Sequence, residues 1–337
     1  MSPTSSVPKR GEPPEDTRAR QHERVSHPGR IENVVQEVSR FYRGDPLGVK
    51  LSLAAILARG HILVEDVPGV GKTTLARSLA GVLDLRFRRI QFTADLLPSD
   101  LLGVPVHDPT SGRFRFRAGP IFTQVLLADE INRAPPRTQS GLLQAMQEGE
   151  VTVDRATRPL PRPFVVLATQ NPLEHHGTYP LPESQLDRFL LRLAPGYPDA
   201  AAERQILQDH AGSPRATVPD PCLSPEDVLG LQDAVDAVRS DPGLLDYILT
   251  VVRRSREHPG LRSGVSPRGA VAFFQAARAL AVVEGRNHLI PDDVTRVLHP
   301  CLDHRVVLRS RGRDPEASRL EAEAILREVV EGVALPV

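Results

Sequence analysis

The chain has 337 residues, of which 40% are hydrophobic and 25% charged, a composition typical of a globular protein long enough for two domains. Lysine plus arginine equals aspartate plus glutamate at 42 residues each, so net charge gives no drive toward DNA or an anionic membrane. With two cysteines and no apolar run long enough for a bilayer span or a signal core, we expect no disulfide framework, no zinc motif, no membrane insertion and a cytoplasmic location.

The first 29 residues are rich in proline, serine, arginine and glutamate and hold almost no large apolar groups. They bury too little surface to offset the entropy of ordering, so we expect a disordered tail over residues 1–29. Two helices are predicted next, over Ile31–Phe41 and Leu47–Ala58, with the turn RGDP between them. Gly60 would end the second helix.

The stretch HILVEDVPGVGKTTLARSLAGVL, from His61 to Leu83, predicts a buried strand, a glycine loop and a helix. Such a loop can turn its N–H groups toward an anion at the positive end of the following helix, so we expect a nucleotide triphosphate here. Lys72 would reach the β- and γ-phosphates, and the Thr73 hydroxyl would ligate Mg²⁺. The expected nucleotide-binding residues are Pro68, Gly69, Val70, Gly71, Lys72, Thr73 and Thr74.

One residue departs from the general phosphate-loop pattern, because Asp66 stands where the first glycine is expected. The alternative interpretation is a glycine-rich turn before a helix. Lysine usage favours the nucleotide site, since the only lysines are Lys9, Lys50 and Lys72 and a lysine at this position is not background composition.

A second strand is predicted from Arg86 to Phe92. After it, the turn-forming DPTSG is followed by alternating arginine and phenylalanine over Arg113–Arg117, which is the pattern of a β-hairpin. These arginines could contact nucleic acid, but a solvated hairpin face is the interpretation that we favour.

The apolar run Val125–Ala128 predicts a further buried strand, which ends in Asp129 and Glu130. At the end of a strand adjacent to the phosphate loop, one carboxylate can hold Mg²⁺ and the next can polarise the attacking water. The pair could instead mark only a helix start. Its place after an apolar strand, downstream of Lys72, favours the catalytic interpretation.

A second hairpin is predicted around Val151–Arg158, and Phe164–Ala168 predicts another buried strand. Asn171 follows that strand, where ligands of open α/β sheets bind, so we expect it within reach of a γ-phosphate. Arg188 stands just before the last predicted strand, Phe189–Leu193.

From Asp199 onward the pattern is helical, with no strand-like runs, and we expect a second domain. Ser224–Asp227 forms a capping box with proline at the first helical position. Arg268 lies in the first turn of a helix that follows Ser266, where the helix dipole disfavours a cation. A nearby anion would explain it, and a solvated arginine is an equally good interpretation from local sequence.

In order along the chain, the segments PGVGKT, LLADE, ATQN, LDRF and SPR resemble the motifs of AAA+ ATPases, and specifically of the MoxR family. The resemblance runs from about residue 30 to about residue 335, and ADEINRAPPRTQSGLLQAMQE is among its most specific segments. It implies an α/β fold: an AAA+ P-loop NTPase core with a parallel sheet flanked by helices and two β-hairpin insertions over 30–197. A smaller, all-α lid domain would follow over 198–337.

The same resemblance implies ATP and Mg²⁺ as cofactors and a role for each carboxylate. Lys72 and Thr73 would bind phosphate and Mg²⁺. Asp129 would be the Mg²⁺ carboxylate and Glu130 the catalytic base. Asp66 leaves these roles unchanged, because the PGVGKT core is intact.

Three further residues receive roles from the resemblance. Asn171 would be sensor one, Arg188 the arginine finger that reaches a neighbouring subunit's nucleotide, and Arg268 sensor two. Family members form rings, usually hexamers, and are thought to act as chaperones for client proteins, often ones with von Willebrand factor A domains. A nucleic-acid motor, a magnesium-chelatase-like subunit and a nucleotide-gated scaffold with little turnover remain the alternatives, with nucleic acid disfavoured by the zero net charge.

Overall fold

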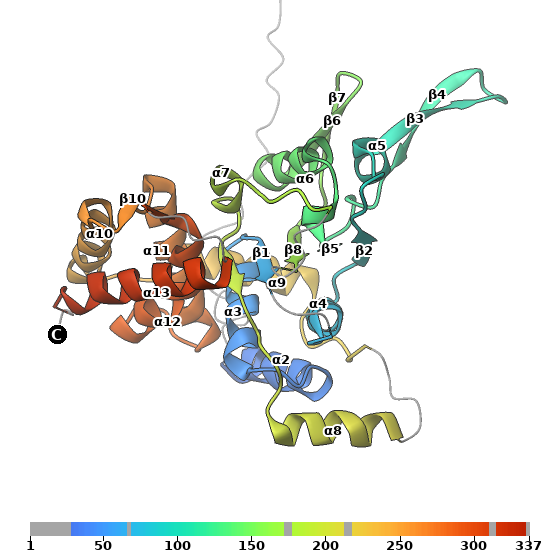
Figure 1. Cartoon of the computed structure of the whole chain (residues 1–337). Coiled ribbons are helices and arrows are strands. Elements are labelled where there is room, and N and C mark those ends of the chain that lie inside the picture. Colours follow the sequence, from blue (N-terminus) through green and yellow to red (C-terminus); the bar gives the residue numbers. More distant parts are fainter. Residues whose placement is uncertain (1–27, 66–68, 172–176, 212–217, 310–314, 335–337) are drawn as a thin grey trace, which may run out of the picture.

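The computed structural model describes residues 28–65, 69–171, 177–211, 218–309 and 315–334. Figure 1 shows a sheet with helices on both faces and, beside it, a helical domain. Residues 1–27 of the expected tail lie outside the described residues. Pro28 and Gly29, which the composition places in the tail, instead begin helix α2 (Pro28–Phe41), since proline is tolerated in a first helical turn.

A five-stranded parallel sheet forms the centre of the first domain. Its strands are β1 (Ile62–Glu65), β2 (Phe87–Gln91), β5 (Val125–Asp129), β8 (Val165–Gln170) and β9 (Leu191–Leu193), in the spatial order β2-β5-β8-β1-β9. This order confirms the expected fold class. The order also corrects one expectation. The sequence predicts that the strand that ends in Asp129 is adjacent to the phosphate loop, but β8 lies between that strand and β1.

The central strands β1, β5 and β8 are buried on both faces, whereas β2 at the edge is partly exposed, and successive side chains point to opposite sides. Ile62 and Val64 of β1 pack into one hydrophobic cluster and Leu63 into another. The first cluster includes helices α2, α3 (Pro46–Leu57) and α4 (Lys72–Val82), and the second includes α6 (Pro136–Glu148). The sheet is thus held between two layers of helices, as Figure 1 shows.

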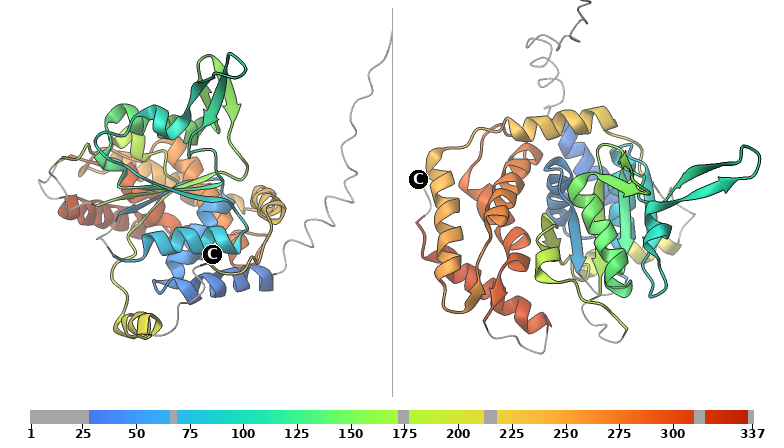
Figure 2. Two further views of the ribbon diagram at one scale, coloured as in Figure 1. Left: turned by 90° about the vertical axis from the view of Figure 1, so that its right-hand side faces the viewer. Right: turned by 90° about the horizontal axis from the view of Figure 1, so that it is seen from above.

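Both predicted hairpins are present as antiparallel strand pairs. They are β3 (Gly103–Asp108) with β4 (Arg113–Ala118), which follows the short helix α5 (Pro98–Leu102), and β6 (Glu150–Val153) with β7 (Ala156–Pro159). The β3–β4 hairpin projects from the core on the side away from the helical domain (Figure 2). The Arg158 guanidinium lies 3.8 Å from the centroid of the Phe116 ring, so a cation–π contact joins the two hairpins.

The second domain is helical, as expected, and also holds one short strand pair. The remaining helices are α7 (Glu183–Leu186), α8 (Ala200–Ala211), α9 (Pro225–Asp236), α10 (Pro242–Glu257), α11 (Pro267–Val283), α12 (Pro291–Leu302) and α13 (Pro315–Glu331), with 3₁₀ turns η1 (Ile131–Arg133) and η2 (Asp303–Arg305). The predicted capping box at Ser224 is formed with Asp227. Strands β10 (Leu261–Ser263) and β11 (Val307–Leu308) contradict the expectation of no strand here, because they are too short to leave a pattern in the sequence. Among the described helices, none combines the length and apolarity needed to cross a bilayer.

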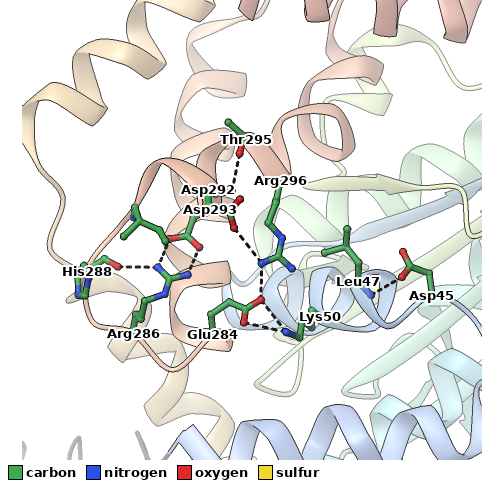
Figure 3. Close-up of polar contacts among 11 residues, drawn as sticks. Asp45, Leu47, Lys50, Glu284, Arg286, His288, Asp292, Asp293, Thr295 and Arg296 are labelled. Carbon is green, nitrogen blue, oxygen red and sulfur yellow. Dashed lines mark hydrogen bonds and ion pairs between the residues drawn. The ribbon is translucent and has the colours of Figure 1, made fainter. Parts of the chain in front are cut away.

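Core and helical domain share one continuous hydrophobic cluster, in which α3 packs on α11. Charged groups border this junction (Figure 3). Lys50 of α3 lies 3.1 Å from the carboxylate of Glu284, which Arg296 of α12 contacts at 2.7 Å. Burial disfavours the ionised form of Glu284, but the hydrogen bonds from Arg296 and Lys50 outweigh it and lower the pKa of the carboxyl. Lys50 therefore connects the two domains.

His61 is a buried histidine at the start of β1. Its Nε2 lies 3.0 Å from the carbonyl oxygen of Met146, and its Nδ1 accepts the N–H of Val166 at 3.0 Å. Burial lowers the pKa of His61 to about 4, although the hydrogen bond to Met146 opposes the shift. A neutral ring that donates from Nε2 and accepts at Nδ1 satisfies both contacts.

We expect the free energy of unfolding to fall as the pH is lowered from about 6.5, where an unfolded histidine begins to protonate. Because the folded pKa of His61 is about 4, the unfolded chain binds the extra proton first between these values. The free energy of unfolding is therefore lower by about 2 kcal/mol at about pH 5, and the full stability is present above about pH 6.5. Urea unfolding of the wild type and of His61→Gln at about pH 7.5 and about pH 5 measures the effect.

His61→Gln should lose less stability on acidification than the wild type. Some loss remains, because burial also holds the pKa of His304 well below its ordinary value and contributes with the same sign. An equal loss in both proteins would contradict the assignment to His61.

Candidate functional site

The phosphate loop leads from β1 into α4. Gly69 and Gly71 have φ values of +92° and +85°, a left-handed backbone that favours glycine. Gly71 is the N-cap of α4, and its carbonyl accepts the N–H of Leu75 at 2.9 Å. Lys72 and Thr73 therefore occupy the first turn of the helix, where N–H groups and the helix dipole favour an anion.

The other expected loop residues differ in exposure. Val70 is buried at 7% exposure and anchors the loop, whereas Gly69 and Thr74 are exposed. Pro68 and Asp66 lie outside the described residues. The described part has the turn and helix start that a phosphate site requires.

Asp129 ends strand β5 and is held by two side chains. Its Oδ1 accepts the hydroxyl of Thr169 at 2.6 Å, and its Oδ2 pairs with the guanidinium of Arg89 at 2.5 Å. The carboxylate side chain is 16% exposed, so one edge remains accessible from solvent. Thr169 is fully enclosed on β8 and fixes the carboxylate from the neighbouring strand.

Glu130 has a strained backbone, with φ +55° and ψ +51° in the left-handed region. Its N–H donates to the Thr169 hydroxyl at 2.9 Å, so a single buried threonine holds both carboxylate residues. Gln91 donates to the Glu130 carboxylate at 2.7 Å, and Arg133 lies 3.3 Å from it. The turn directs Glu130 away from the regular path of the strand.

Asn171 follows β8 and is 8% exposed. It stands next to Gln170, which pairs in register with Glu65, the last residue of β1. Gln170 also donates a side-chain hydrogen bond to the Glu65 carboxylate, and Arg192 of β9 lies 3.5 Å from that carboxylate. Asn171 is therefore fixed beside the end of the phosphate-loop strand.

The two expected arginines lie apart from these contacts. Arg188 is half-buried after α7, and Arg268 is exposed in the first turn of α11, after the N-cap Ser266. Within the part of the chain that the structure describes, neither guanidinium has a hydrogen bond or ion pair. The structure thus brings Asp129, Glu130 and the neighbourhood of Asn171 together, and the contacts that hold them include neither Arg188 nor Arg268.

Sequence reasoning missed the side chains that hold the carboxylates, which are Arg89, Gln91, Arg133 and Thr169. The sequence of β2 did hold a signal for two of them. Residues two apart on a strand share a face, so the polar residues Arg89 and Gln91 point to the same side of the sheet. Their register opposite Leu127 and Asp129 could not be known from sequence alone.

The donor set suits Mg²⁺ and a nucleotide triphosphate. The Thr73 hydroxyl and the Asp129 carboxylate are hard oxygen ligands, which Mg²⁺ prefers, and it usually keeps several waters beside phosphate oxygens. No group of three or more His, Cys, Asp or Glu residues that could hold a metal ion occurs among the described residues. The arrangement fits an ion shared with phosphates better than a metal held by the protein alone.

Comparison with known proteins agrees with this geometry. Residues 61–191 match the model of the ATPase family associated with various cellular activities (AAA), and residues 253–329 match an AAA lid domain. The YeaC protein of Bacillus subtilis is 47% identical over 90% of this chain and 94% of its own length. Chaperone MoxR1 of Mycobacterium tuberculosis is 40% identical over 91% of this chain and 82% of its own length. The crystal structure of a proposed ATPase from Cytophaga hutchinsonii superimposes with a TM-score of 0.86 at 34% identity, covering 96% of this chain and 99% of that one.

The parallel sheet, the phosphate loop and the following lid define an AAA ATPase, which hydrolyses ATP. Within that class, the similarity to MoxR1 and to the MoxR protein of Paracoccus denitrificans, 34% identical over 79% of this chain, shows a narrower relationship. The chain belongs to the MoxR family of AAA ATPases.

Thr169→Val removes the hydroxyl that joins Asp129 to the Glu130 backbone and keeps nearly the same shape. We expect the free energy of unfolding to fall by about 1–3 kcal/mol, since both partners lose a buried hydrogen bond. Turnover of ATP should fall at least about tenfold, because the backbone that aims the Glu130 carboxylate loses its hydrogen bond to Thr169. Denaturant unfolding and steady-state ATPase assays measure the two effects.

Thr138→Val is a matched control. Thr138 is also fully enclosed, and its hydroxyl donates to the carbonyl of Leu96 at 2.7 Å, away from the carboxylates. It should lose stability and keep its turnover per folded molecule. Equal turnover in the two variants would show that Thr169 has no role beyond stability.

Proposed function

We propose that the chain is an ATP-driven chaperone that remodels, matures or activates partner proteins, among them proteins with von Willebrand factor A domains. The similarity to a protein named Chaperone MoxR1 supports this proposal. The observation that carries it is the division of the proposed site between domains, with Asp129 on the core and Arg268 on the lid. A nucleotide bound to both would let hydrolysis change the angle between them.

Nucleotide binding rests on the phosphate loop. We propose that the loop backbone and Lys72 bind the phosphates and that Thr73 and Asp129 hold Mg²⁺. The ion would neutralise charge on the β- and γ-phosphates. The seven proposed nucleotide-binding residues are Pro68, Gly69, Val70, Gly71, Lys72, Thr73 and Thr74.

Hydrolysis requires a base and a group that orients the attacking water. We propose Glu130 as the base, because a carboxylate that is fixed by its backbone and by Gln91 can be aimed at one water. Asn171 would contact the γ-phosphate or the water from the end of β8. Arg268 would contact the same phosphates from the lid.

Arg188 is proposed to complete the site of a neighbouring subunit. Its guanidinium has no partner among the described residues of its own chain, which is the state expected of a group that acts on another subunit. Such a role requires a ring with head-to-tail interfaces, and we propose a hexamer.

Client binding is proposed for the projecting β3–β4 hairpin. Phe114 is 72% exposed near its tip, and an exposed large apolar group on a projecting element suits contact with another protein. The opposite hairpin face carries Arg113, Arg115 and Arg117 without ion pairs among the described residues. That face supports a nucleic-acid motor as the second candidate, and salt-sensitive stimulation of ATPase activity by DNA would favour it.

Glu130→Gln should bind ATP without hydrolysing it and should be trapped as a ring. We expect light scattering to show a shift to a mass of about six subunits with ATP and Mg²⁺. Lys72→Ala, which should not bind ATP, is the control and should stay small. A monomeric Glu130→Gln protein under all conditions would contradict a site shared between subunits and favour the nucleotide-gated scaffold.

Arg188→Ala should bind ATP normally and hydrolyse it on the order of a thousandfold more slowly. Mixing it with Glu130→Gln should restore activity, because each variant supplies the group that the other lacks. At equal amounts about a quarter of the interfaces are intact, since each joins two subunits drawn at random. No recovery in rings shown to be mixed would contradict the role of Arg188 in trans.

A further inference from the structure

Arg305 of the lid is a buried arginine whose contacts surround the segment that carries Arg188. Its side chain is only 2% exposed, and it follows α12 in the turn η2. Its Nε donates to the Asp187 carboxylate at 2.9 Å. Its terminal nitrogens donate to the carbonyls of Phe189 at 2.6 Å and Leu190 at 3.0 Å.

These contacts lie on both sides of Arg188 along the chain. Asp187 precedes Arg188 and Phe189 follows it. The hydrogen bonds from Arg305 to these neighbours fix the backbone on both sides of Arg188, although Arg305 does not bond to Arg188 itself. His304 adds a contact to the Phe189 carbonyl, with Nε2 3.0 Å away. Arg188 is the one residue from 187 to 190 whose side chain and carbonyl receive none of these bonds.

The guanidinium suits this task because its donors form a rigid planar fork. A single group therefore fixes one carboxylate and several carbonyls in a set geometry, and a lysine could not reproduce it. Arg305 also donates to the carbonyl of Cys301 in α12, which ties the fork to the lid. The helix α12 packs on α11, which carries Arg268 at its start.

We propose that Arg305 is a positioning residue for Arg188, so that the lid of each subunit orients the arginine that this subunit offers to its neighbour. The proposal rests on the proposed role of Arg188 in trans. It adds that the lid, rather than the core alone, sets the position of that group. A subunit with a damaged Arg305 should therefore fail as a donor and keep its own nucleotide site.

The test is Arg305→Gln, assayed alone and in mixed rings. Alone, the variant should bind a fluorescent ATP analogue with unchanged affinity and hydrolyse ATP on the order of a hundredfold more slowly, as expected for a misplaced catalytic group. Mixed with Glu130→Gln, it should regain activity, because the Glu130→Gln subunit keeps both Arg305 and Arg188. A general lid defect would act in the variant's own site, so absence of recovery would overturn the proposal.

Two mixing experiments distinguish a failure of the proposed role of Arg305 from a failure of the proposed role of Arg188. Recovery with the pair Arg188→Ala and Glu130→Gln establishes donation in trans. If that pair recovers and the Arg305→Gln pair does not, the proposed function stands and this inference fails. If neither recovers, the role of Arg188 in trans has failed and the inference falls with it.

Arg286→Gln is a matched control for damage to the lid. Arg286 pairs with the fully buried Asp293 at 2.5 Å (Figure 3). It is not among the groups that hydrogen-bond to residues 187–190. This variant should lose thermal stability and keep its ATPase activity per folded molecule. If Arg286→Gln loses as much ATPase activity as Arg305→Gln and recovers equally when mixed with Glu130→Gln, damage anywhere in the lid is sufficient. That result would overturn the specific role of Arg305.

Asp187→Asn provides a second test if Arg305→Gln does not fold. The Asp187 side chain is 22% exposed, so the change is milder, and it weakens the charge-assisted bond to Arg305. We expect a loss of ATPase activity on the order of tenfold, unchanged nucleotide affinity and recovery by Glu130→Gln. Unchanged activity in a folded Asp187→Asn ring would overturn the proposal.

Discussion

The parallel pairing of β5, β8 and β1 is the constraint on which the site depends. Because parallel strands end at one edge, residues far apart in sequence arrive together without any direct attraction between them. Thr169 then joins two of these strand ends, since one hydroxyl both donates to Asp129 and accepts from Glu130. A shift of one residue in the β5–β8 register would turn Thr169 to the other face and separate all three groups.

The lid is attached to the core by two kinds of contact. Apolar side chains of α3 and α11 belong to one hydrophobic cluster. Lys50, Glu284 and Arg296 border it with a charged network that fixes the relative register of the helices. Such pairs contribute less free energy than the apolar area, because each charge gives up water. Their role here is geometric.

The fold could be predicted from sequence in large part, because its signals are local. The strand at Ile62–Val64, both hairpins and the capping box at Ser224 follow from short patterns and are found in the structure. Strand order could not be predicted, since β8 is inserted beside β1 by long-range packing. The strands β10 and β11 are too short for any period to be visible.

The candidate site could likewise be predicted from sequence only in part. Glycine positions, carboxylates after an apolar strand and Asn171 after another were indicated by their place at element ends. Arg89, Gln91 and Thr169 were missed because their importance lies in which strand they face. Arg305 gave no signal at all, since nothing local connects it with Asp187, 118 residues earlier.

The shared hydrophobic cluster between core and lid limits the kind of movement that this molecule can make. A wide hinge opening would expose the apolar faces of α3 and α11, which are among the most completely buried surfaces of the chain. Sliding of packed helices keeps those faces covered and needs only small side-chain adjustments. The lid is therefore suited to short sliding displacements, and any change in its angle to the core is small enough to keep these apolar faces covered.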